Sequence, residues 1–101
     1  MMEFQYEPEL QAYMQKHGQK TILVELVEIN TSDLELMELH VRFANSHIRN
    51  LFLTKKNYRC VETQCGEVLL PRYPLKISDT VTFGLKSILF FKHIKYSGIQ
   101  I

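Results

Sequence analysis

The sequence predicts an α+β domain, with an N-terminal helix packed on a mainly antiparallel β-sheet or a flattened β-sandwich. Residues 8–17 repeat apolar side chains at helical spacing, whereas later stretches alternate apolar and polar residues at the period of a strand. With 101 residues, of which 46% are hydrophobic, the chain is long and apolar enough for one domain with a single modest core.

The helix predicted over residues 8–17 has both a start signal and a stop signal. Pro8 suits the first helical position, where its missing N–H costs no hydrogen bond. Gly18 can adopt the left-handed conformation that ends many helices. Four residues at helical spacing form a mostly apolar face: Leu10, Tyr13, Met14 and His17.

The longest apolar run, residues 21–29, predicts the central strand. Both of its alternating faces are apolar along most of their length, which is typical of a strand covered on both sides. Glu25 and Glu28 would project to opposite faces, so they do not form a general acid and base pair. The simpler interpretation places each at the rim of the sheet or against a lysine. The alternative is a buried carboxylate with a raised pKa.

Residues 32–53 fit two different structures. As a helix, Ser32 and Glu35 would form a capping box before a spaced apolar stripe, and local propensity favours this interpretation. As a strand, the apolar residues between Met37 and Phe43 alternate with polar ones, the pattern of a half-buried strand.

The second half of the chain predicts a hairpin followed by an interruption. Residues 58–61 and 67–70 flank a turn in which Gly66 supplies a positive φ. Pro71 and Pro74 prevent regular pairing, so this segment predicts a stiff, exposed crossing.

Two further strands are expected near the C-terminus. Residues 77–80 predict a turn that leads into a strand at residues 81–83, and residues 84–87 a connection. The last strand is expected roughly over residues 89–101. Its apolar residues change parity, which predicts a one-residue bulge at Ser97-Gly98.

Composition argues against several classes of partner. A net charge of +1 is too small for a sequence-independent nucleic-acid clamp, so a nucleic-acid partner is disfavoured. No apolar run approaches the roughly 20 residues that span a bilayer, and residues 1–7 do not have the order of a signal peptide. We therefore expect a cytoplasmic protein with no membrane partner, whose two cysteines are reduced thiols.

Only three residues are candidate metal ligands: Cys60, Cys65 and His40. In the predicted hairpin Cys60 lies within a strand and Cys65 near the tip, too far apart for a disulfide, and we expect Cys65 to be the more exposed. His40 would lie on a polar face beside Glu38 and Arg42, as a solvated residue. A lone C-x4-C pair does not define a zinc site, so we predict no metal, no cofactor and no catalytic residue.

The order of the elements, rather than a catalytic motif, carries a family resemblance. A helix ending at Gly18 precedes a strand ending in Val27-Glu28-Ile29-Asn30-Thr31. The Gly66 hairpin, the apolar run Asp79-Thr80-Val81-Thr82-Phe83 and a closing strand from Ile94 to Ile101 then follow. This order resembles the small HesB/IscA-like proteins, in particular a bacterial branch with a Cys-Cys or Cys-selenocysteine pair.

The resemblance implies a HesB-like fold, and it favours the strand for residues 35–43. We therefore expect a strand there, followed by an irregular segment over residues 45–57 that could contain a helical turn. In that branch the reactive pair follows the first strand, where this chain has Thr31-Ser32-Asp33. The C-terminal C-x-C of the IscA type is also missing near Ser97-Gly98. No functional cysteine is carried over, which implies that this member has lost cluster chemistry.

These observations predict a non-enzymatic protein that acts by binding or association. Its apolar last strand could close a sheet edge or pair with a second chain as a homo-oligomer. The alternative is a thiol-dependent iron–sulfur or metal carrier using Cys60 and Cys65 across a dimer interface, because two thiolates per chain do not complete four ligands. An enzyme using Glu25 or Asp33 with a histidine is a third hypothesis, for which the sequence suggests no substrate.

Overall fold

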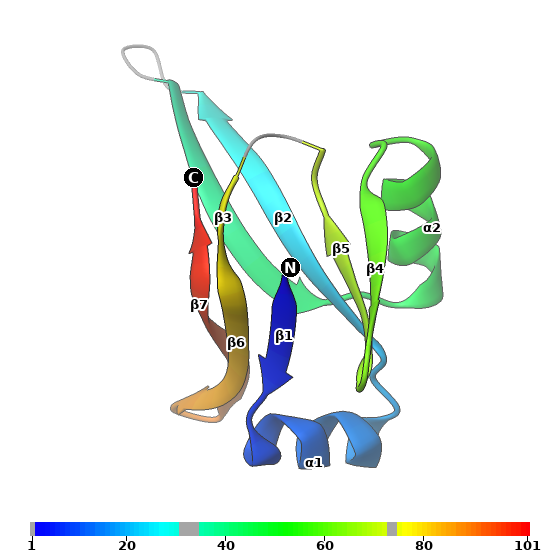
Figure 1. The fold of residues 1–101 in the computed structure, drawn as a ribbon, viewed down its shortest axis with the longest axis vertical. Helices are drawn as coiled ribbons and strands as arrows, with labels where there is room; N and C mark the ends of the chain where they lie inside the picture. The colour runs from blue at the N-terminus through cyan, green and yellow to red at the C-terminus, as the bar shows by residue number, and fades with distance from the viewer. Residues whose placement is uncertain (1, 31–34, 73–74) are drawn as a thin grey trace.

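The computed structural model describes residues 2–30, 35–72 and 75–101. This part of the chain forms seven strands and two helices, so the expected α+β class is confirmed (Figure 1). The elements in order are β1 (Glu3–Tyr6), α1 (Pro8–His17), β2 (Thr21–Asn30), β3 (Glu35–Phe43), α2 (Ser46–Thr54), β4 (Arg59–Thr63), β5 (Gly66–Leu70), β6 (Lys76–Ile88) and β7 (Phe91–Gln100).

The strands form two sheets, in the orders β1-β6-β7 and β3-β2-β5-β4. Pairing is antiparallel in β2–β3, β4–β5 and β6–β7, and parallel in β1–β6 and β2–β5. Figure 1 shows α1 across one end of the sheets and α2 beside β4. The main core lies between the sheets and α1, with buried side chains from β1, β2, β5, β6 and β7.

Strand β1 is absent from the sequence-based expectations, although its residues alternate. Phe4 and Tyr6 are buried, and the intervening Gln5 is exposed. Both aromatic rings pack on Phe83 of β6, with ring centroids 5.9 and 5.8 Å apart. The Tyr6 hydroxyl and the Thr63 hydroxyl of β4 are 2.9 Å apart, which links the two sheets. Four alternating residues are a weak signal until a partner strand is known.

Helix α1 and strand β2 match their predictions. Gly18 ends α1 with φ +65. The first four residues of β2 are buried, and the remainder is only half buried because β5 pairs with Thr21 to Leu23 alone. Glu25 lies at the sheet rim and accepts a hydrogen bond from Arg42 at 3.1 Å, so its partner is an arginine rather than a lysine.

The sequence-based prediction for the region after β2 is correct for the strand and wrong for the segment that follows it. Strand β3 spans residues 35–43 as expected, and the alternative capping box at Ser32 lies outside the described residues. The irregular segment expected at residues 45–57 contains instead the nine-residue helix α2. The Asn45 side chain caps it by accepting from the Ile48 N–H at 2.8 Å. The helix forms because it buries Phe52 against Leu23 and Leu69, on the far side of the β2–β5 sheet.

The hairpin around Gly66 is confirmed as β4 and β5. Gly66 has φ +150, and a Cβ there would collide with the Lys20 carbonyl. The exposed crossing expected from Pro71 is wrong at that residue, because Pro71 is buried, and Pro74 lies outside the described residues.

The turn expected at residues 77–80 and the connection at 84–87 are both wrong. All of these residues belong to the single strand β6. Residues 84–87 pair with β7, whereas in the first segment Ile77 pairs with β7 and Thr80 with β1, so strand pairing outweighs the local turn signals. The expected irregularity near Ser97-Gly98 is present, but the extra residues are in β6. Ile77 pairs with Ile99 and Thr82 with Ser97, so only Gly98, at φ +90, lies opposite four residues.

Candidate functional site

The most connected polar group on the described surface is centred on the Glu67 carboxylate. Arg49 of α2 donates from two guanidinium nitrogens to the two oxygens of Glu67, at 2.5 and 3.1 Å. The Thr21 hydroxyl of β2 donates to Oε1 at 2.9 Å, and the Cys60 thiol of β4 donates to Oε2 at 2.8 Å. Four elements therefore meet at one side chain.

The ladder explains why the thiol reaches the carboxylate. Cys60 pairs with Leu69, and Glu67 is two residues further along β5, on the same face of the sheet. Helix α2 covers the same face and supplies Arg49. These residues are separated in the sequence, and only the folding of the chain brings their side chains together. The sequence alone therefore does not reveal the group.

Charge and hydrogen bonding shift the pKa values of this group in opposite directions. The hydrogen bonds from Arg49 lower the pKa of Glu67 from 4.5 to about 2. The pKa of Cys60 is raised, first because the thiol is partly shielded from water although the residue is exposed, and then because it donates to the Glu67 carboxylate. Cys60 is therefore held as a protonated donor, not as a thiolate nucleophile.

Cys65 lies in different surroundings. It is the less exposed of the two cysteines, so the expected order of exposure is wrong. Gln64 and Cys65 form the turn of the β4–β5 hairpin, and Cys65 lines a pocket of about 400 Å³ between that hairpin and the end of α1. Cys65 is partly buried because it packs against the main core. The pocket lining consists of Gln11, Met14, Gln15, Gly18, Gln19, Lys20, Gln64 and Cys65.

Glutamine is the most frequent residue in the lining of this pocket, and the spacing of three of these glutamines is visible in the sequence. Gln11, Gln15 and Gln19 are spaced by four, so they follow one face of α1 and its exit. Gln11 donates from its side-chain amide to the Tyr6 carbonyl at 2.7 Å, which ties that carboxamide to the fold. The remaining amides can both donate and accept hydrogen bonds, and Lys20 is the one charged residue of this lining.

His40 lies on the outward face of β3, as expected. Its Nε2 is 2.9 Å from Oε2 of Glu38, and both side chains are about half exposed. Strands β3 and β7 run together here, and His40 borders the shallow groove between them. Over residues 2–30, 35–72 and 75–101 no three His, Cys, Asp or Glu side chains gather to hold a metal ion. The structure does not bring Cys60, Cys65 and His40 together.

The end of the β6–β7 hairpin differs from the sequence-based prediction. We call residues 88–91 the hairpin tip. Its four consecutive apolar side chains are exposed by 50, 87, 97 and 67%, in the order Ile88, Leu89, Phe90 and Phe91. The last-strand expectation included Leu89 and Phe90, but these two residues form the turn instead.

No family model, curated protein or solved structure matches this chain. The helices of the described residues are also too short and too polar to cross a bilayer.

Proposed function

We propose that this chain is a non-enzymatic association protein of HesB-like fold, and that the hairpin tip is its contact surface. The exposure of the tip carries the proposal. Four adjacent large apolar side chains remain in water although the same chain buries Phe4, Phe52 and Phe83. Full burial of such a side chain contributes about 1.5–3 kcal/mol, so a surface that covers the tip gains several times that amount.

The thiol and carboxylate chemistry supports a binding role over catalysis. Glu67 is occupied by Arg49, Thr21 and Cys60, so it is not available as a base. The raised pKa of Cys60 works against its use as a nucleophile or as a metal ligand, since both need the thiolate. The thiol-dependent iron–sulfur carrier is therefore the less supported function. Reconstitution with iron and sulfide under anaerobic conditions, followed by absorption spectroscopy, separates the two: our proposal expects a colourless protein.

The HesB-like part of the proposal is supported by the order of the elements. A helix ends at Gly18, β2 ends at Asn30, Gly66 begins the second strand of a hairpin, and β7 closes the chain. These are the features on which the resemblance depends.

A homo-oligomer through an edge strand is the narrower form of this proposal. Strand β7 is at the edge of its sheet. Its C-terminal half lies against β3, and the half that begins at the hairpin tip extends away from β3 (Figure 1). That half is where a second chain would pair.

The test measures association with and without the tip. Sedimentation equilibrium over a wide concentration range reports self-association of the wild type, Phe90→Ser and a control, Leu36→Ser. Leu36 is an exposed apolar residue of β3, outside the tip. A wild-type chain that stays monomeric removes the homo-oligomer. The tip is rejected as a contact surface if Phe90→Ser changes neither self-association nor adsorption to lipid vesicles.

A further inference from the structure

We infer that the hairpin tip inserts into the interfacial region of an anionic lipid bilayer. This inference rests on the proposed function, in which the tip is the contact surface, and it names the partner. A lipid partner departs from the sequence-based expectation of no membrane partner. That expectation rested on the absence of a spanning segment, whereas a peripheral protein needs only apolar side chains that reach the boundary between headgroups and acyl chains.

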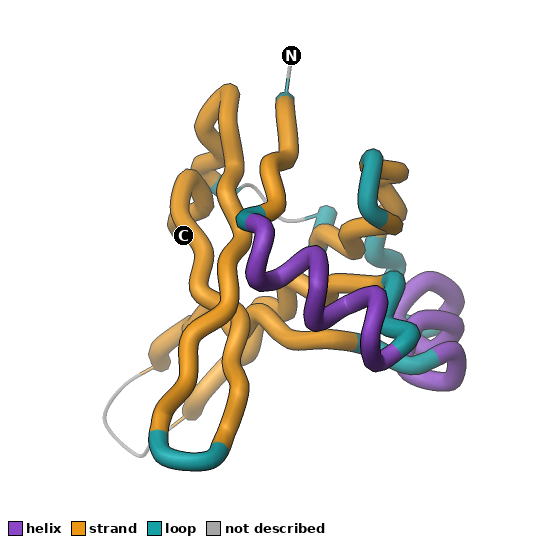
Figure 2. Tube along the Cα trace, turned by 90° about the horizontal axis from the view of Figure 1, so that it is seen from below, coloured by secondary structure: helices purple, strands orange, loops and turns teal. Residues whose placement is uncertain are grey.

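The shape of the tip is the first feature that favours a lipid partner. Ile88 and Phe91 are the last pair of the ladder, so Leu89 and Phe90 alone make the turn. Figure 2 shows this turn at the end of two long strands, projecting away from both helices. The tip is therefore convex and carries its apolar groups at the outermost point. A convex apolar end can insert into the interface of a bilayer, whereas a protein partner would need a complementary pocket.

The backbone of Leu89 is the second feature that favours a lipid partner. Its φ is +56, a conformation that is unfavourable for a side chain and in which glycine is the favoured residue. The leucine side chain is almost entirely in water, so no packing in the described chain compensates for the strained backbone. An exposed leucine at a glycine-type position is explained by a contact that the apolar side chain makes outside the chain.

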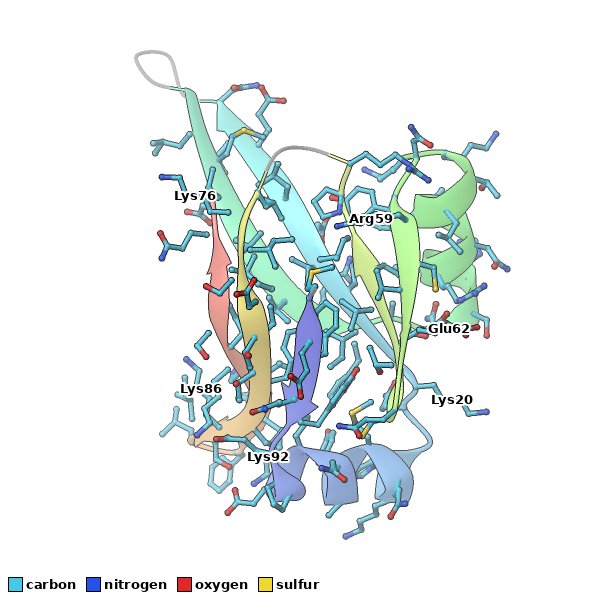
Figure 3. All side chains as sticks on the ribbon, viewed as in Figure 1. Lys20, Arg59, Glu62, Lys76, Lys86 and Lys92 are labelled. Carbon is cyan, nitrogen blue, oxygen red and sulfur yellow. The ribbon has the colours of Figure 1, made fainter. Side chains whose placement is uncertain are left out.

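The charge around the tip is the third feature that favours a lipid partner. Lys86 pairs with His93, and Ser87 pairs with Lys92. Paired residues share a face and successive residues alternate, so Lys86 and Lys92 project from opposite faces of the hairpin just behind the tip. Figure 3 shows both lysines near the end of this hairpin. Residues 81–101 contain three lysines and neither aspartate nor glutamate.

Cations on both faces fit a lipid surface better than other partners. A bilayer surrounds an inserted tip, so anionic headgroups would meet Lys86 and Lys92 at the same depth while their alkyl stems stay at the boundary. A flat protein surface would engage one face only. A second copy docked tip to tip would bring its own lysines against these lysines, with no acidic residue in residues 81–101 to balance them.

The test is co-sedimentation of the full chain with phosphatidylcholine vesicles, with and without phosphatidylglycerol. We expect binding to the anionic vesicles that weakens as salt is raised. Phe90→Ser should weaken binding about tenfold or more, given the apolar burial that is lost. The double variant Lys86→Gln/Lys92→Gln should weaken binding to anionic vesicles by more than about tenfold, and binding to neutral vesicles little. Leu36→Ser, outside the tip, should bind as the wild type does.

Leu89→Gly separates docking from folding. Glycine relieves the backbone strain, so this variant should unfold at the same denaturant concentration as the wild type or a higher one, yet bind anionic vesicles several-fold more weakly. A variant that is destabilised and binds normally would show that Leu89 has a structural role. That result would overturn the inference.

The outcomes also distinguish this inference from the proposed function. Equal binding to neutral and anionic vesicles, or binding that Phe90→Ser leaves unchanged, overturns the lipid partner. If the wild type does not bind vesicles while Phe90→Ser abolishes self-association, the lipid partner is wrong and the association function stands. If Phe90→Ser affects neither property, both are wrong.

Discussion

Glu67 joins more elements of this protein than any other single side chain described above. Its carboxylate receives hydrogen bonds from α2, β2 and β4 while it stands on β5. The bidentate arginine makes this contact stronger than a single surface ion pair. Partial burial of the thiol, and then its hydrogen bond to the Glu67 carboxylate, raise the pKa of Cys60. The carboxylate that ties α2 to the sheet therefore also helps to keep this thiol protonated.

Stability should fall as Glu67 is protonated. Its pKa is about 2 in the folded chain against 4.5 ordinarily, so its contribution is fully present above about pH 4.5 and is lost as pH falls toward 2. Glu67→Gln should lower the free energy of unfolding at neutral pH by about 1.5–3 kcal/mol, toward the lower end because Arg49 is partly exposed. It should also reduce the acid dependence in that window.

Urea unfolding at a series of pH values measures both effects. Glu62→Gln is the matched control, because Glu62 lies directly opposite Glu67 in the ladder and is exposed. The control should retain the acid dependence. If Glu67→Gln and Glu62→Gln have the same pH profile, the assigned role of the Arg49 contact is wrong.

Helix α2 illustrates how an element depends on its ends and on one buried face. Nine residues are too few for a helix to persist alone, so α2 depends on Phe52 and on its cap. Phe52 meets Tyr58 edge-on, with ring centroids 4.9 Å apart, and both are buried against β2 and β5. The first turn of α2 contains no acidic residue, which leaves Asn45 to satisfy its N–H groups.

Removal of the Asn45 cap should be measurable. Asn45→Ala loses the acceptor for the Ile48 N–H and should lower the free energy of unfolding by about 0.5–2 kcal/mol. Asn45→Asp keeps an acceptor and adds a negative charge at the helix N-terminus, so it should be at least as stable as the wild type. Guanidinium unfolding compares the three proteins. Equal losses in both variants would contradict the capping role.

At the scale of the whole molecule, two sheets are held together by side chains from nearly every strand. Phe83 is fully buried at the centre, where it packs on both aromatic residues of β1. The hairpin tip is the opposite case, because its aromatic residues make no such core. The molecule therefore separates aromatic residues that stabilise the fold from aromatic residues that are available for contact.

A pair of identical substitutions tests this separation. Phe83→Ala should lower the free energy of unfolding by about 3–5 kcal/mol, a large part of the total for a domain of this size. Phe90→Ala, at a position that is 97% exposed, should change it by less than about 0.5 kcal/mol. Guanidinium unfolding of both variants gives the comparison. A similar loss at Phe90 would mean that the tip packs on the chain and is not a free surface.

Local signals were sufficient for α1, β2 and the Gly66 hairpin, because a cap, a run of apolar residues or a turn glycine acts over a few neighbouring positions. For β3 they were not, since local propensity favoured a helix there and the strand was expected from the family resemblance. The α+β class followed from them. The same signals identified Cys60 as a candidate, but not its partners Glu67, Arg49 and Thr21, which come from three other elements.

Tertiary structure alone decided the rest. Residues 46–54 form a helix because Phe52 is buried against β2 and β5. Strand β6 continues through two apparent turns because it pairs with β1 and β7 around the first turn and with β7 along the second. The exposure of Cys60 and Cys65, and the projection of the hairpin tip, likewise depend on which elements cover them. Burial and strand pairing join residues that are distant in the chain, so a sequence by itself determines which residues can form an element, and only the folded chain decides which of them remain in water.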